Sequence, residues 1–153
     1  MNQKRRGTAN DLCVQVRGLK PYPLSFDYSD PGGRQLVRQR IRAVLQQMPS
    51  ADPAKIEVVI GEALSNAVKH GNTIRIKVNK IGKLLVIRVK DNGDGFAGNI
   101  KVKAVTAMGV EKVFESLLME ERGRGIPVMM FWMDKILYNR QGNEIMLVKS
   151  ITG

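Results

Sequence analysis

The sequence predicts one domain that mixes α-helices and β-strands. Three patterns support this: apolar residues at helical spacing in residues 31–70, strict apolar alternation in residues 74–91, and a hairpin pattern in residues 135–151. The chain has 153 residues, the size of a single domain, and no repeat or linker divides it. We therefore expect residues 11–153 to fold as one unit behind a disordered tail of residues 1–10.

The first elements are one or two strands followed by a helix. Apolar alternation from Leu12 to Val16 and from Leu24 to Tyr28 predicts the strands. Asp30 and Pro31 then supply an N-cap and a residue suited to the first position of a helix. The apolar side of this helix is predicted to consist of Leu36, Val37, Ile41, Val44, Leu45 and Met48.

A second helix is predicted from Asp52 and Pro53, which repeat the cap-and-proline start, to Gly71, a C-terminal cap. Glu62 and Asn66 are four residues apart, so they lie one above the other at the margin of its apolar stripe. Polar groups at a core margin are partly desolvated and need a ligand, a metal ion or water. The stripe itself consists of Ile56, Val59, Ile60, Ala63, Leu64 and Ala67.

Two strands follow, and the second ends in a carboxylate. Ile74 to Val78 and Leu85 to Val89 alternate, and continuing the alternation places Asp91 on the core side, where it needs a hydrogen-bond donor. Residues 91–95, Asp-Asn-Gly-Asp-Gly, are typical of a plain tight turn. The inward Asp91 favours the other interpretation: its carboxylate accepts a hydrogen bond from the amino group of adenine, and the glycines let the base approach the backbone.

The segment of residues 97–122 gives the weakest pattern. Val113, Phe114, Leu117 and Leu118 suggest a short helix within a polar loop. The final hairpin is predicted to turn at residues 141–143.

Gly123 to Gly125 lead into Ile126, Pro127 and an apolar helix. These glycines form either a flexible connector or, with Arg124 and the free N–H groups of the helix start, a phosphate site. The cluster that follows is more typical of a core than of a binding groove; it consists of Met129, Met130, Trp132 and Met133.

The net charge of +11 raises the question of an anionic partner. Nucleic acid is disfavoured, because the longest basic run is Lys4-Arg5-Arg6 and aromatic residues make up only 5% of the chain. An acidic protein partner is favoured instead. Arg34, Arg38 and Arg42 lie four apart on one helix face, which is either a solvated surface or the docking surface for such a partner.

No apolar run is long enough to span a membrane, and residues 1–7 lack the apolar stretch of a secretory signal. The lone Cys13 excludes an internal disulfide and suits a reducing cytoplasm, which is the expected location. One cysteine and one histidine make a structural zinc site very improbable. That histidine, His70, is expected to be a packed residue at the helix end rather than a catalyst.

Together the motifs resemble the GHKL-type ATPase domains, and within them the anti-sigma factor serine kinases of bacteria. Residues 62–70, Glu-Ala-Leu-Ser-Asn-Ala-Val-Lys-His, resemble the family's N box, and residues 91–96 its adenine box. Residues 121–129 with 133–136 resemble the second glycine box and its helix. The resemblance implies a two-layer α/β sandwich, with helices on one face of a mixed, mostly antiparallel sheet.

The resemblance also implies roles for individual residues. Asn66 would bind Mg²⁺ that bridges the phosphates of ATP, and Glu62 would polarise the hydroxyl of a serine on a partner protein. Asp91 would bind the adenine amino group. The remaining nucleotide-binding residues would be Gly93 and Gly95 at the base pocket, and Gly123, Arg124, Gly125 and Ile126 around the phosphates. One departure is Gly142-Asn143, where these kinases commonly have Gly-Thr.

The implied function is that of an ATP-dependent protein-serine kinase and anti-sigma factor. It would phosphorylate a small anti-sigma-factor antagonist, hold a sigma factor when free, and form a homodimer, with no direct contact to nucleic acid or membrane. The alternative is a nucleotide-gated module that binds its partner without transferring phosphate. A sensor histidine kinase fragment is disfavoured, because the sequence has no room for a separate phosphoacceptor hairpin.

Overall fold

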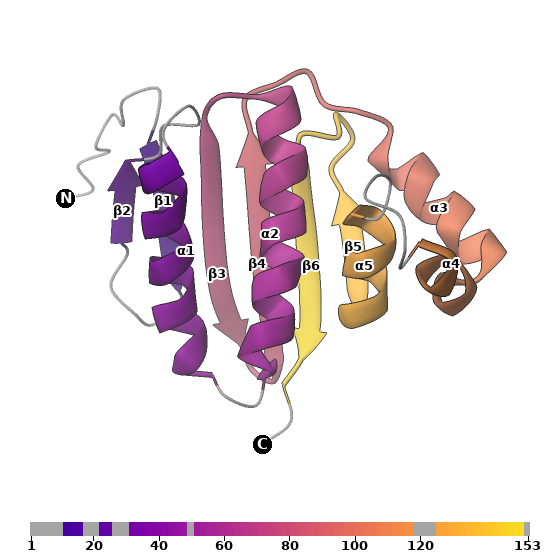
Figure 1. The fold of residues 1–153 in the computed structure, drawn as a ribbon, viewed down its shortest axis with the longest axis horizontal. Coiled ribbons are helices and arrows are strands. Elements are labelled where there is room, and N and C mark those ends of the chain that lie inside the picture. Colours follow the sequence, from indigo (N-terminus) through magenta and orange to yellow (C-terminus); the bar gives the residue numbers. More distant parts are fainter. Residues whose placement is uncertain (1–10, 17–21, 26–30, 49–50, 118–124, 152–153) are drawn as a thin grey trace.

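The computed structural model describes residues 11–16, 22–25, 31–48, 51–117 and 125–151. Within them a six-stranded sheet carries the helices on one of its faces (Figure 1). In chain order the elements are β1 (Asp11–Val16), β2 (Tyr22–Ser25), α1 (Pro31–Gln46), α2 (Pro53–His70), β3 (Ile74–Ile81), β4 (Leu84–Asp91), α3 (Gly98–Met108), α4 (Val110–Leu117), α5 (Gly125–Trp132), β5 (Lys135–Tyr138) and β6 (Glu144–Ser150).

The sheet is mixed and mostly antiparallel, as predicted. Its strand order is β2-β1-β3-β4-β6-β5, and only the β1–β3 pair is parallel. Ile76 lies opposite Val89, which in turn lies opposite Ile145, so the apolar sides of three strands share one face. This face meets the helices and forms the core, with α2 crossing the middle of the sheet (Figure 1).

The predicted apolar stripes of the first two helices form the core, with one exception. Every stripe residue of α2 is buried, and so are those of α1 apart from Leu36, which is 43% exposed. At 100° per residue Leu36 lies about 120° from the centre of the other five residues, so it faces away from the sheet. α1 begins at Pro31 as predicted, whereas Asp30 lies outside the described residues.

Both predicted caps of α2 work differently from the expectation. Pro53 is the first helical residue, but Asp52 makes no side-chain cap; its φ is 56° and its carboxylate instead pairs with Lys55 at 3.1 Å. Gly71 ends the helix in an extended conformation, with φ −151°, so a left-handed turn is not the reason for glycine. A Cβ at position 71 would lie 2.6 Å from Asn92 Oδ1, so packing excludes a side chain there.

The sequence missed α3, because a polar loop was predicted where residues 98–108 form a helix. Few of its apolar residues are buried, and it is held by tertiary contacts. Val102 and Val105 pack against the core, and the side chain of Asn99 exchanges two hydrogen bonds of 3.0 Å with the backbone of Tyr138 on β5. The short helix predicted around Val113 is present as α4.

Several predictions fall outside the described residues: the tail of residues 1–10, the second half of the Leu24–Tyr28 alternation, and Gly123 with Arg124. Both N-terminal strands and the final hairpin are present. Among the described residues, no helix is long and apolar enough to cross a membrane.

Candidate functional site

The start of α5 lies against the polar pair of α2. Glu62 and Asn66 are both half-buried on α2. A Cβ built on Gly125 would lie 3.3 Å from Glu62 Oε2 and 3.4 Å from Asn66 Nδ2. The fold therefore joins two segments that the sequence separates by about 60 residues, and glycine at position 125 leaves the two side chains accessible from the cavity in front of them.

That cavity, which we call the interhelical cavity, has a volume of about 980 Å³ and lies between α2, α3, α4 and α5. Its polar wall includes two lysines, Lys69 and Lys101, and Gly125, the first residue of α5, lines it as well. Cationic side chains and free helix N–H groups favour an anion such as a phosphate chain. The other polar residues of the wall are Glu62, Ser65, Asn66 and His70.

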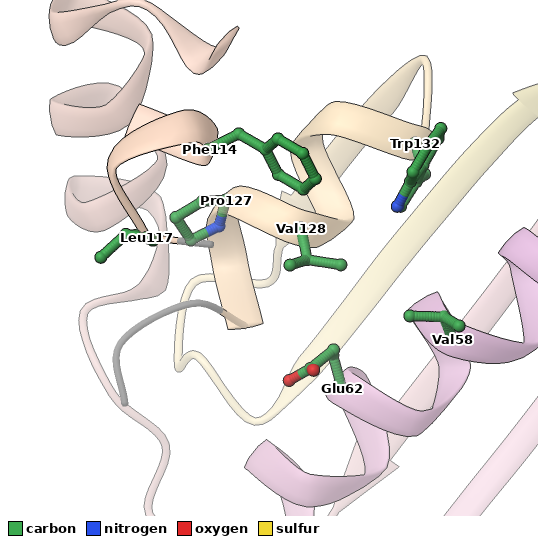
Figure 2. A pocket seen from close by; sticks show the side chains of 7 residues that line it. All are labelled: Val58, Glu62, Phe114, Leu117, Pro127, Val128 and Trp132. Carbon is green, nitrogen blue, oxygen red and sulfur yellow. The ribbon is translucent and has the colours of Figure 1, made fainter. Parts of the chain in front are cut away.

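A second opening, the apolar pocket, adjoins the first and has a volume of about 250 Å³. Figure 2 shows it between α2, α4 and α5, and Glu62 is the charged side chain among the described residues of its wall. Glu62, Leu117 and Pro127 line both spaces, so the Glu62 carboxylate stands at the boundary between them. The remaining wall of the apolar pocket consists of Val58, Phe114, Val128 and Trp132.

The prediction that the Met-Trp cluster belongs to the core holds for Met129 and Met133, which are buried. Met130 and Trp132 are half-buried and pack against this core, and Trp132 also lines the apolar pocket. Trp132 meets Phe131 edge to face at 4.8 Å, and Phe131 stacks on Phe114 at 4.0 Å. This aromatic group packs α4 against α5 beside the apolar pocket.

Asp91 lies at the end of β4 on the core side, as the alternation predicted, and is 7% exposed. Its Oδ1 accepts a hydrogen bond of 2.7 Å from the Gly93 N–H. Burial raises the pKa of the Asp91 carboxyl, while the hydrogen bond from Gly93 and the charge of His70 act in the opposite direction. Oδ2 accepts no hydrogen bond from the described residues, so a donor on a ligand would complete the carboxylate.

The glycines around Asp91 pack the loop of residues 92–97 against its neighbours. A Cβ on Gly93 would overlap the His70 carbonyl, and one on Gly95, where φ is 83°, would overlap the Gln141 carbonyl. Neither lines the cavities at the site. Their observed contribution is to hold this loop between the end of α2 and the β5–β6 turn, whereas the sequence assigned them to the base pocket.

The space beside Asp91 is nearly full. The cavity there has a volume of only about 10 Å³, enough for roughly one water molecule. The rings of Phe96 and Tyr138 border it, meeting edge to face at 4.9 Å. The phosphate end of a nucleotide therefore fits the chain as it stands, while an adenine ring does not fit beside Asp91 until one of these rings moves.

Tyr138 carries a buried hydroxyl near the side-chain amide of Asn66. Its hydroxyl makes no hydrogen bond within the described residues. Burial raises the pKa of Tyr138 to about 12, and the nearby Asn66 amide offsets part of this increase. The sequence analysis missed Tyr138, although its alternation with Ile136 on β5 could have placed it on the core side.

His70, at the end of α2, stacks on Phe96 with ring centroids 5.1 Å apart, in accordance with the expected packing role, but it is exposed at the edge of the interhelical cavity. Lys101 is on α3, and its Nζ lies 5.2 Å from the centroid of the same Phe96 ring. Phe96 is thus held by two residues that also line the interhelical cavity.

Asn143 occupies the place where the resembling kinases commonly have threonine. It is buried, its backbone oxygen accepts a hydrogen bond of 2.9 Å from the Asp91 N–H, and its Oδ1 accepts one of 2.7 Å from Asn139 Nδ2. These bonds join the start of β6 to the end of β4. Asn143 therefore fixes the backbone on which Asp91 stands.

The donor set also limits how a metal ion could be held. No group of three His, Cys, Asp or Glu side chains in the described part of the chain is placed to bind one. Mg²⁺ prefers oxygen ligands and keeps several waters, so Asn66 Oδ1 together with phosphate oxygens fits it better than any site made by protein alone.

A family model described as "Histidine kinase-like ATPase domain" matches residues 29–149, and the chain belongs to this family. Over 50 residues it is 36% identical to the signal transduction histidine-protein kinase AfsQ2 of Streptomyces coelicolor; the match covers 32% of this chain and 9% of that protein. The histidine kinase AdeS of Acinetobacter baumannii has a TM-score of 0.44 and 15% identity, covering 95% of this chain and 56% of that chain.

The family confirms the predicted GHKL-type fold and implies ATP as the ligand, usually with Mg²⁺. The chain spans a small part of AfsQ2 and about half of the AdeS chain, and both are histidine kinases. The family model establishes an ATPase domain of the histidine-kinase-like class, which is broader than the anti-sigma factor serine kinases that the motifs resemble.

Proposed function

We propose that this protein is an ATP-dependent protein-serine kinase of a bacterial partner-switching pathway, with a small anti-sigma-factor antagonist as its acceptor. The observation that carries the proposal is the position of Glu62. Its carboxylate stands where the interhelical cavity meets the apolar pocket, one helical turn from Asn66 and against the start of α5. A base between a nucleotide and an entering acceptor needs this position.

In this proposal each residue has one task. Lys69, Lys101 and the N–H groups at the start of α5 hold the phosphates. Asn66 Oδ1 would provide one oxygen ligand for Mg²⁺, which would supply neutralisation of charge on the phosphates. Glu62 accepts the proton of the acceptor serine as the serine oxygen bonds to the γ-phosphorus and the bond to the ADP oxygen breaks. The apolar wall beside Glu62 keeps water from competing as the acceptor.

A serine in a partner is favoured over a histidine in this chain by the position of His70. It is the only histidine of the 153 residues, it ends α2, and its ring stacks on Phe96. A phosphoacceptor must reach the γ-phosphate in line with the leaving oxygen. His70 lies on the same wall as the phosphate-binding residues, so it is better placed to contact a bound nucleotide than to attack it.

The test combines phosphate transfer with nucleotide binding. The protein is incubated with labelled ATP, Mg²⁺ and its antagonist, and ATP affinity is measured by calorimetry with and without Mg²⁺. Glu62→Gln should slow transfer by about a hundredfold or more while leaving the ATP affinity within about threefold, because a base contributes to the step and little to binding. Glu57→Gln is the matched control, since Glu57 is on the same helix but pairs with Arg42 outside the cavities.

Asp91→Asn tests the proposed adenine-binding role of Asp91 separately. Because burial raises the pKa of Asp91, its carboxylate is costly to keep charged, and removing the charge should raise the stability of the unliganded protein at neutral pH. ATP affinity should fall by about tenfold or more, since the adenine amino group loses its acceptor. Undiminished affinity in this variant would remove Asp91 from the adenine site.

Nucleotide-dependent partner binding without any phosphate transfer would support the alternative, a gated binding module. The basic face predicted for that role, Arg34, Arg38 and Arg42, is described in part. Arg42 pairs with Glu57 at 2.7 Å, Arg38 is exposed, and the side chain of Arg34 lies outside the described residues.

A further inference from the structure

The face of the sheet opposite the helices carries a compact basic cluster, which we call the basic quartet. It consists of Arg75, Lys77, Arg88 and Lys90, all exposed. Arg75 lies directly opposite Lys90, and Lys77 lies directly opposite Arg88, on the adjacent strands β3 and β4. The four Cα atoms therefore stand at the corners of a rectangle of about 5 by 7 Å.

This arrangement is unfavourable within the domain itself. Like charges directly opposite each other on neighbouring strands repel and destabilise a sheet. None of the four forms an ion pair among the described residues, including Lys90 with Glu144, its opposite neighbour on β6. Basic residues placed only for solubility can lie far apart on the surface. Two basic pairs side by side on neighbouring strands instead make a local excess of positive charge that an anionic partner would neutralise.

An apolar strip continues from the basic quartet toward the edge of the sheet. Met146 lies between Arg88 and Leu137 in register, and Val148 lies opposite Val86, which is itself buried. Leu137 is 44% exposed, and Met146 and Val148 are half-buried. Among the described elements no helix covers this face (Figure 1), so charged and apolar surfaces lie side by side on one flat area.

We propose that this face docks an amphipathic acidic segment of a partner protein. Carboxylates along one side of such a segment would lie over the basic quartet, and apolar side chains along the other would lie over Met146, Val148 and Leu137. The surface is independent of the nucleotide site, which lies under the helices on the other face. A peptide with carboxylates on one side and apolar side chains on the other would complement both the charge and the apolar area of this face.

Nucleic acid fits this face less well. A phosphate backbone has no apolar side to cover the strip, and the described residues of the open face include no aromatic ring on which a base could stack. A second copy of this chain fits less well too, since each copy carries a net charge of +11.

The experiment uses a helical peptide of about 16 residues, with glutamates on one side and leucines on the other, which is about 24 Å long. This length matches an eight-residue strand such as β3. Binding is measured by fluorescence anisotropy against a scrambled peptide of equal composition, a DNA duplex and phosphatidylglycerol vesicles. Backbone amide NMR locates the bound peptide on β3, β4 and β6 or elsewhere.

Two variants with the same charge change separate location from net charge. The test variant replaces the basic quartet with glutamine, and the control replaces four other exposed lysines, at positions 80, 83, 103 and 112. The test variant should bind the peptide about tenfold or more weakly, with less salt dependence, and the control should change affinity less than about threefold. The melting temperature of the test variant should equal or exceed that of the wild type, because repulsion within the basic quartet is relieved.

Leu137→Ser tests the apolar strip and should weaken binding by about threefold at unchanged salt dependence. Equal weakening in the two glutamine variants would overturn the proposed location. Equal affinity for the scrambled peptide, or no effect of Leu137→Ser, would overturn the amphipathic partner. Tighter binding of the duplex or the vesicles, lost in the same test variant, would assign the face to a different class of polyanion and overturn the proposal as stated.

Discussion

Tyr138 and Asp91 border the same small cavity, and the buried Tyr138 hydroxyl makes no hydrogen bond within the described residues. Such groups lower stability unless a ligand completes them. Adenine is expected at this site. The same polar groups that destabilise the unliganded domain would then form hydrogen bonds with the bound base. The rings of Phe96 and Tyr138 fill the space until then.

Tyr138→Phe should make the protein more resistant to alkaline unfolding. The pKa of Tyr138 is raised to about 12 in the folded protein from an ordinary value of 10.0. The folded state therefore holds this proton more tightly than the unfolded state. The resulting stabilisation, about 2–3 kcal/mol, is fully present below pH 10 and is lost as the pH rises toward 12.

The measurement is chemical denaturation of both proteins at neutral pH and between pH 10 and 12. Near neutrality Tyr138→Phe should match or exceed the wild type by about 1 kcal/mol, because it removes a buried hydroxyl without a partner. Above pH 10 the difference should widen in favour of the variant. An identical alkaline decline in both proteins would show that Tyr138 does not titrate with unfolding.

Sequence patterns could place Asp91 but not the rings beside it. The alternation of β4 determines which way Asp91 points, and this depends only on local periodicity. Whether the cavity is open depends on how Phe96 from a loop and Tyr138 from β5 meet, and the two are about 40 residues apart in the chain. No local pattern carries that information.

At the scale of elements, the contact between α2 and α5 organises the site, and two glycines test it. Gly61→Ala, inside α2, has no atom within 4 Å of the new Cβ and should stabilise the protein by about 0.5–1 kcal/mol. Gly125→Ala should instead reduce ATP affinity, since its Cβ would stand 3.3 Å from Glu62 Oε2 in the interhelical cavity, where the phosphates are proposed to bind. Thermal melts and ATP calorimetry of both variants give the comparison.

If Gly125→Ala kept its ATP affinity, the start of α5 would not be the phosphate site. A parallel loss of affinity in Gly61→Ala would point to a general effect on α2 rather than a local one. The pair is matched in chemistry, because each variant adds one methyl group to a helical glycine.

The same contrast between local and tertiary information explains which helices the sequence could predict. α2 has a proline start and six apolar residues at regular spacing, all buried. α3 contains the β-branched residues Ile100, Val102 and Val105, of which Ile100 is 69% exposed. Its position depends on the Asn99–Tyr138 hydrogen bonds, which join residues 39 apart in sequence. A pattern of local apolar spacing therefore finds α2 and misses α3.

For the molecule as a whole, the excess of positive charge should make stability depend on salt. The chain has 25 basic and 14 acidic side chains, and the described residues contain three ion pairs, of which Arg42–Glu57 and Lys55–Asp52 are largely exposed. We expect the charge repulsion within a protein of net charge +11 to exceed the stabilisation that exposed ion pairs provide. Raising NaCl from about 0.02 to 0.3 M should increase the melting temperature by a few degrees.

Circular dichroism melts over this range provide the measurement, with sodium sulfate at equal ionic strength as a check on specific anion binding. A melting temperature that falls with salt would mean that attractive pairs dominate. The glutamine variant of the basic quartet should respond less to salt than the wild type, because part of the repulsion is already removed.

The strand order has a consequence for how the domain assembles. The sheet consists of three antiparallel pairs of strands close in sequence, β1–β2, β3–β4 and β5–β6, joined by the β1–β3 and β4–β6 pairings between distant segments. Close pairs form quickly, and distant pairings are slow because they must close long loops. Asp91 belongs to the middle pair, and Tyr138 and Asn143 to the last hairpin. The proposed adenine site would therefore form only when β4 pairs with β6, so ATP would bind only chains that have finished folding.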